Sequence, residues 1–95
     1  MSNYIKLRKC LLKILYENFK EYPYASMELK QLEEECNITP KELNWNIVYL
    51  EKCGYVELGK SSDCPPYIAA MATITAKGID IVEKTEYEGE VNICL

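Results

Sequence analysis

Cysteine has the widest chemical repertoire of the residue types in this chain, and it occurs at positions 10, 36, 53, 64 and 94. Thiols can act as nucleophiles, bind metals or form disulfides. There is no C-x-x-C pair and no histidine, which excludes the structural zinc sets that include histidine. The pattern favours free thiols in a reducing cytoplasm. A redox pair between Cys53 and Cys64, at the foot and tip of a predicted hairpin, stays open as the alternative.

Catalysis finds little support in the remaining polar residues. Without histidine, general-base work falls to a carboxylate or a perturbed lysine. No paired carboxylates stand in an apolar context that would raise a pKa, and no glycine-rich phosphate loop is present. The cysteines have no base close to them in sequence. We therefore predict that the chain is not an enzyme and uses no metal and no cofactor.

The net charge of −4 conceals an asymmetry along the chain. Residues 1–20 carry five basic groups and one acid, a net of +4, whereas residues 21–95 carry six lysines and fourteen acids, a net of −8. A nucleic-acid-binding face is usually basic, so the acidic second part argues against strong unaided binding of phosphate. No apolar run reaches the length of a membrane span, and the N-terminus lacks the apolar stretch of a signal peptide. We expect a cytoplasmic protein that does not enter the membrane.

The clearest local pattern is ITPKELNWNIVYLEKCGYVELG, residues 38–59. Thr39 followed by Glu42 three residues later is a capping box, and Pro40 suits the first helical position. Gly54 follows the last periodic residue, where a left-handed residue ends a helix. The pattern predicts a helix over 39–53, followed by a strand.

Hydrophobic periodicity and turn residues predict the other elements. We expect a helix over 4–20, a short strand at 24–25, and a second helix over 27–36 capped by Ser26. A hairpin with strands at 55–58 and 67–75 should follow, then a helix over 76–87 capped by Thr75 and an acidic tail over about 88–95.

The first helix is unusually apolar, with apolar residues over roughly 240° of the helical wheel, whereas a surface helix needs a stripe of about 100°. Either this helix packs on a second subunit, or it is a central helix wrapped by its own domain. The residues that would build a dimer interface share one side of the helix; they are Tyr4, Leu7, Leu11 and Ile14.

The order helix, helix, helix, strand, strand, helix resembles the winged helix-turn-helix superfamily of small prokaryotic regulators. ITPKELNWNIVYLEKCGYVEL is similar to the recognition-helix segment of multiple-antibiotic-resistance-type regulators, and ITAKGIDIVE to the start of their last helix. The resemblance implies one α+β, mainly α domain over residues 1–95. This domain would have a three-helix core, a two- or three-stranded β-wing and a C-terminal helix.

The resemblance also implies a function: a homodimeric transcription regulator that places helix 39–53 in the major groove of double-stranded DNA and its wing on the backbone. Lys41 would contact phosphate, and Asn44 could pair bidentately with adenine. The full set of candidate DNA-binding residues comprises Lys41, Asn44, Trp45, Tyr49, Lys60, Ser61 and Ser62.

A second hypothesis makes the chain a winged-helix module that binds another protein. Aromatic residues are favoured anchors at protein interfaces, and the outward face of helix 39–53 carries such a set. The partner-binding residues would be Trp45, Val48 and Tyr49. The alternative is a purely structural role for Trp45, in which residues 65–67 fold back and cover its ring.

Overall fold

The computed structural model describes residues 4–59 and 66–87 of the chain, with side chains described up to residue 84. The elements over these residues are α1 (Tyr4–Glu21), β1 (Met27–Glu28), α2 (Leu29–Cys36), α3 (Pro40–Lys52), β2 (Val56–Gly59), β3 (Met71–Ile74) and α4 (Ala76–Tyr87). Within the described part, four helices and one three-stranded sheet form a mainly helical α+β fold. This class is the one that the sequence predicted.

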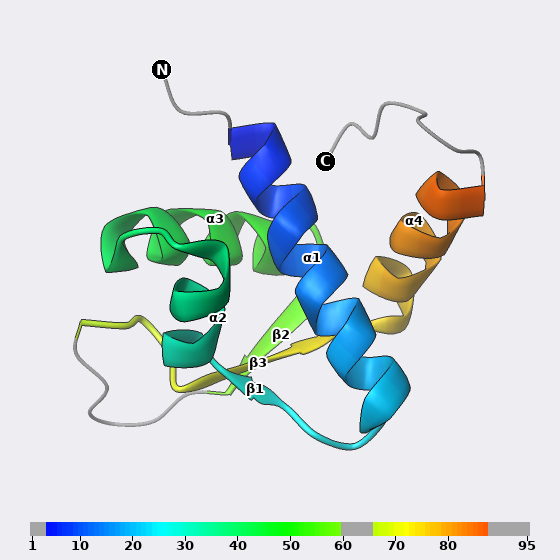
Figure 1. The fold of residues 1–95 in the computed structure, drawn as a ribbon, viewed down its shortest axis with the longest axis horizontal. Helices are drawn as coiled ribbons and strands as arrows, with labels where there is room; N and C mark the ends of the chain where they lie inside the picture. Colours follow the sequence, from blue (N-terminus) through cyan, green and yellow to red (C-terminus); the bar gives the residue numbers. More distant parts are fainter. Residues whose placement is uncertain (1–3, 60–65, 88–95) are drawn as a thin grey trace.

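Helix α1 is the centre of the structure. It crosses one side of the sheet, with α2 and α3 to one side of it and α4 to the other (Figure 1), and it contacts α2, α3, α4 and β3. Leu11, Leu12 and Leu15 are almost completely buried by these contacts. These contacts bury part of the broad apolar arc of α1 within its own chain, whereas Ile5 stays 53% exposed and Tyr4, Leu7 and Ile14 stay half-buried. Among the described residues, no helix combines the length and the apolar character needed to cross a membrane.

The sheet is antiparallel, with strand order β1-β3-β2. Val56 of β2 pairs with Ile74 of β3, and Met27 of β1 pairs with Ala72. All four of these side chains are buried, because residues at alternate positions of a strand point to the same face. The sheet thus contributes one apolar face to the core.

The prediction for the start of α2 was wrong. Ser26 does not cap a helix; its hydroxyl is hydrogen-bonded to that of Thr73 at 2.6 Å. The strand is at Met27–Glu28 and not at 24–25, and the helix begins only at Leu29. Pairing with β3 extends the backbone at Met27 and places its side chain in the core. This tertiary contact overrides the local capping signal.

The predicted capping box of α3 is confirmed. The Thr39 hydroxyl accepts from the Glu42 backbone N–H at 3.1 Å, and the Glu42 carboxylate accepts from the Thr39 backbone N–H at 3.2 Å. Gly54, with a φ of 84°, follows the helix in the left-handed conformation. Three apolar side chains that recur at helical spacing are fully buried, namely Leu43, Ile47 and Leu50. Helix α3 is therefore held firmly at both ends and along one face.

The start of α4 also follows the prediction. The Thr75 hydroxyl accepts from the Gly78 backbone N–H at 3.1 Å and donates to the Gly54 carbonyl at 2.6 Å. Gly78 lies against the strand: a Cβ there would fall well inside contact distance of the Tyr55 carbonyl oxygen and 2.8 Å from Ile74 Cγ1. The I-T-x-x-G pattern therefore has a physical basis, since its threonine caps α4 and its glycine lets α4 approach the sheet.

The strand predicted over 67–75 is shorter than expected. Only Met71–Ile74 forms β3, while residues 66–70 follow an irregular path. Residues 66–68 of that segment are hydrogen-bonded to side chains of α2 and α3, as described below.

Candidate functional site

The outward face of α3 is the most exposed functional candidate. Lys41, Trp45 and Lys52 are exposed and recur at helical spacing on the side opposite Leu43 and Ile47. The Trp45 side chain is 58% exposed, and the Lys41 ammonium lies 5.3 Å from the centroid of its ring. Two cations thus flank one exposed aromatic side chain.

Trp45 stays 58% exposed although residues 66 and 67 lie near α3, and residue 65 of the predicted covering segment lies outside the described residues. An indole with more than half of its surface exposed is free to contact a ligand. Val48, the next apolar side chain of the predicted partner-binding set, is half-buried and packs partly against the core. Trp45 is therefore the main apolar group that α3 presents to solvent.

Asn44 has a role in the structure that its sequence position did not indicate. Its side-chain amide nitrogen donates to the Pro66 carbonyl at 2.9 Å, and its oxygen accepts from the Ile68 backbone N–H at 3.0 Å. These are the two groups that would pair with adenine. Reading a base with Asn44 would require both bonds to break, so its role as a base reader remains only a prediction.

The segment 66–68, which Asn44 fixes beside α3, is also held by α2. The Tyr67 hydroxyl donates to the Glu33 carboxylate. This hydrogen bond, together with burial and the charges of Glu33 and Glu34, raises the pKa of Tyr67 to about 12. Segment 66–68 is therefore anchored to both helices. Ile68, 57% exposed, extends the apolar surface next to α3.

Tyr49 lies at the edge of the same face and contacts α1. The Arg8 guanidinium carbon stands 3.7 Å from the centroid of the Tyr49 ring, a cation–π distance. A side-chain hydrogen bond to Cys53 and, next, burial raise the pKa of Tyr49. Since one side of its ring is occupied by Arg8, Tyr49 has less surface for a partner than the prediction assumed.

Arg8 of α1 is hydrogen-bonded to an asparagine side chain of α3. Its Nε donates to Asn46 Oδ1 at 2.8 Å, and Asn46 Nδ2 donates to the Glu42 backbone carbonyl at 2.7 Å. Asn46 is only 1% exposed. Sequence reasoning missed this residue; the available signals were an asparagine on the inward side of α3 and an arginine within the apolar arc of α1.

The candidate dimer residues differ in what they expose. Leu11 is completely buried in its own chain, so it has no surface to offer a second subunit. Tyr4, Leu7 and Ile14 are half-buried, so each still has exposed surface that could contact a second subunit.

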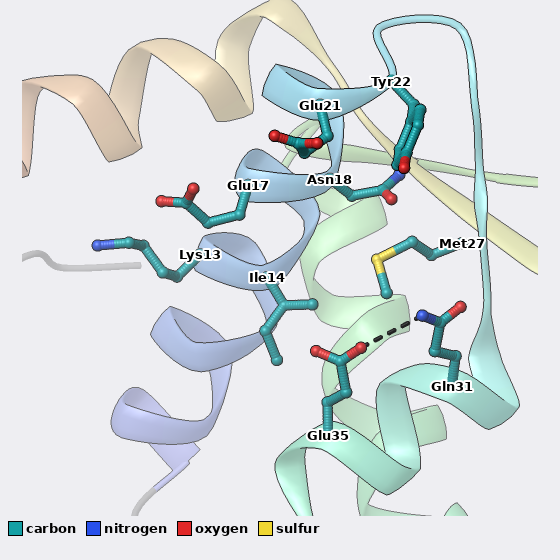
Figure 2. Close-up of a pocket in the computed structure, with 9 residues that line it drawn as sticks. All are labelled: Lys13, Ile14, Glu17, Asn18, Glu21, Tyr22, Met27, Gln31 and Glu35. Atoms are coloured by element: carbon teal, nitrogen blue, oxygen red, sulfur yellow. Dashed lines mark hydrogen bonds between the residues drawn. The ribbon is translucent and has the colours of Figure 1, made fainter.

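A groove of about 300 Å³ lies between α1 and the β1–α2 segment. This is at the lower end of the range for small-molecule sites. Figure 2 shows Ile14, Met27 and Glu35 pointing toward one another, with the Glu35 carboxylate accepting from the Gln31 amide at 3.2 Å. The residues that line the groove are Lys13, Ile14, Glu17, Asn18, Glu21, Tyr22, Met27, Gln31 and Glu35. Three of these lining side chains are acidic and one, Lys13, is basic.

Several predicted residues lie outside the described part of the chain. These are the wing residues Lys60, Ser61 and Ser62, Cys64 of the predicted redox pair, and the acidic tail over 88–95. Within residues 4–59 and 66–84, no group of three or more histidine, cysteine or acidic side chains could hold a metal ion.

No protein-family model matches the chain, and a search of curated proteins also finds none.

Proposed function

We propose that this chain is a winged helix-turn-helix transcription regulator that binds double-stranded DNA, with α3 as its recognition helix. The observation that carries the proposal is the outward face of α3, where Lys41 and Lys52 flank the exposed Trp45. Lysine is a phosphate-binding residue and an exposed aromatic ring can pack on sugar or base.

The arrangement around α3 supports the proposal. Helices α2 and α3 are joined by residues 37–39, and Asn37 takes a left-handed φ of 55° in that turn. An antiparallel hairpin of β2 and β3 follows α3 directly. A short turn between two packed helices followed by a hairpin is the expected layout of a recognition helix and its wing. Asn44 and Tyr67 fix the returning arm of the hairpin against the helix pair.

The charge on this face limits the affinity. Each phosphate contact contributes about −0.9 to the slope of log K against log salt for duplex DNA. Two lysines on α3 therefore predict a slope of roughly −2 per chain, plus whatever the wing adds. The magnitude of this slope is much smaller than that of a strongly basic DNA-binding protein. We therefore expect binding to random DNA that is weak and that weakens further as salt is added.

The test is a titration of labelled duplex DNA by fluorescence anisotropy at several salt concentrations. Lys41→Ala and Lys52→Ala should each weaken binding and reduce the salt slope by about 1. Lys84→Ala, which removes an exposed lysine from α4, is the matched control and should leave both unchanged. Equal effects of Lys41→Ala and Lys84→Ala would reject α3 as the DNA-binding face.

A homodimer belongs to the proposal as well. Two-fold symmetry would place the two α3 helices about one turn of DNA apart, ~34 Å. The half-buried side of α1 formed by Tyr4, Leu7 and Ile14 is the surface we propose for the contact. Sedimentation of the chain, alone and with DNA, measures the mass of the species present. If one chain alone is bound to each DNA site at saturation, the homodimer is rejected.

A second candidate function, a protein-binding module, is favoured by one specific observation. Trp45 and Ile68 are each more than half exposed, and Asn44 fixes residue 68 next to α3. Exposed apolar groups gathered on one surface mark interaction sites more often than chance exposure does. The two functions separate in the DNA titration: a protein-binding module would show no salt-dependent DNA binding that depends on Lys41 and Lys52.

A further inference from the structure

Two half-buried thiols meet where α1 packs against α2. Cys10 Sγ and Cys36 Sγ lie 3.0 Å apart in a sulfur–sulfur hydrogen bond, and the two helices contact each other along this side. A disulfide bond is about 2.05 Å long, so a relative shift of about 1 Å would bring the sulfurs to bonding distance. Cys36 is the last residue of α2, so a small movement at the end of that helix would be enough.

We infer that Cys10 and Cys36 form an intramolecular disulfide when the chain meets a small-molecule disulfide, and that this bond links α1 covalently to α2. The inference does not depend on DNA binding. It concerns a different pair from the Cys53–Cys64 pair that the sequence suggested.

The reaction is an ordinary thiol–disulfide exchange in two steps. In the first, the Cys10 thiol loses its proton to water and its sulfur attacks one sulfur of the small disulfide; one thiolate leaves. In the second, the Cys36 thiol gives up its proton as its sulfur attacks the Cys10 sulfur of this mixed disulfide, and the second thiolate leaves and takes up a proton. The small disulfide is reduced to two thiols, and the two cysteines are oxidised to one cystine.

The surroundings of Cys36 give the two thiols this order of reaction. Burial and, next, the hydrogen bond with Cys10 raise the pKa of Cys36 to about 12. Cys36 therefore keeps its proton at neutral pH and reacts only once Cys10, in mixed-disulfide form, is held beside it. Proximity makes this second step intramolecular and therefore fast.

Metal binding is the other chemistry open to two adjacent thiols, but the described residues provide no third ligand. A structural zinc site needs four ligands. Within the described part of the chain, no cluster of three or more cysteine, histidine or acidic side chains exists. The pair therefore suits a two-electron oxidation better than a metal.

The bond would close a loop of 26 residues between α1 and α2. A disulfide over a loop of this length stabilises a protein by restricting its unfolded chain. For a domain of this size we expect the melting temperature to rise by about 10 °C on oxidation.

The experiment uses the full chain in buffers with increasing ratios of oxidised to reduced glutathione. Remaining thiols are alkylated, and the folded protein is then digested with trypsin without reduction. Each of the five cysteines falls on a different tryptic peptide, so every possible pair has its own mass. The expected product joins peptide 10–13 (CLLK) to peptide 31–41 (QLEEECNITPK) in a chain of monomeric mass.

Three serine variants complete the test. Cys10→Ser and Cys36→Ser should each lose the oxidation-dependent rise in melting temperature, whereas Cys53→Ser, the matched control at a third half-buried thiol, should keep it. The inference is overturned if peptides 10–13 and 31–41 are recovered separately under excess oxidised glutathione, or are joined to other cysteines. Because the peptide map is made on the unmodified chain, it decides the question even if a variant fails to fold.

Discussion

Replacing Gly78 with alanine tests the contact between α4 and the sheet. A Cβ at position 78 would overlap the Tyr55 carbonyl oxygen and lie 2.8 Å from Ile74 Cγ1. The carbonyl cannot easily move, because it accepts the Thr75 backbone N–H at 2.9 Å. The overlap must therefore be relieved by a shift of α4 or of the strand.

The magnitude follows from two opposing effects. Overpacking by a methyl group in a tight contact costs typically about 1–3 kcal/mol. Alanine recovers at most about 1 kcal/mol through its better helix propensity. The expected net loss is about 1–2 kcal/mol, which for a domain of this size lowers the melting temperature by roughly 4–16 °C.

The assay is thermal unfolding by circular dichroism, with Gly59→Ala as the matched control. At Gly59 the nearest atoms to a new Cβ belong to Met71, at 3.8 Å, an ordinary contact distance. This control should unfold within a few degrees of the unmodified chain. If Gly78→Ala is as stable as Gly59→Ala, the close approach of α4 to the sheet is not a feature of the folded protein.

Three further predictions concern side chains around α3. Asn46→Ala should cost about 2–3 kcal/mol in denaturant unfolding, because it removes two part-buried hydrogen bonds, one of them to the charged Arg8 guanidinium. A loss below about 0.5 kcal/mol, the scale of an ordinary surface substitution, would contradict that network. The pKa of Tyr67 is raised from 10.0 to about 12 by its bond to Glu33, so the stability from this bond should be complete below pH 10 and decline as pH rises to about 12. Tyr67→Phe should lack this decline, and an unchanged alkaline profile would argue against the bond. Trp45 is the single tryptophan and is 58% exposed, so a soluble quencher should reduce its fluorescence efficiently; a shielded indole would refute its exposure.

Local signals predicted the ends of α3 and the start of α4 correctly. Thr39 and Glu42 cap α3 as predicted, Gly54 takes the left-handed conformation after it, and Thr75 caps α4. Such signals can be read directly because a capping bond spans only three residues and depends little on the rest of the fold. The apolar spacing of α3 likewise predicted its buried side correctly.

Signals failed where a distant partner competes for the same group. Ser26 bonds to Thr73 across the sheet, and Asn44 bonds to the backbone of residues 66 and 68. Neither partner can be inferred from spacing, since each is more than twenty residues away. For the same reason, spacing along the chain could not indicate that Asn44 fixes residues 66–68 beside α3.

The sequence by itself determined the order of the elements, the ends of α3 and α4, and the apolar side of each helix, because capping and periodicity are local. Only the tertiary structure decided that α1 contacts α2, α3, α4 and β3 and that Asn46 is hydrogen-bonded to Arg8. It also decided that Trp45 stays exposed and that Cys10 meets Cys36. Each of these facts depends on which surfaces pack together. Packing brings together residues that are far apart in the sequence, and their sequence separation follows no pattern from which the contact could be predicted.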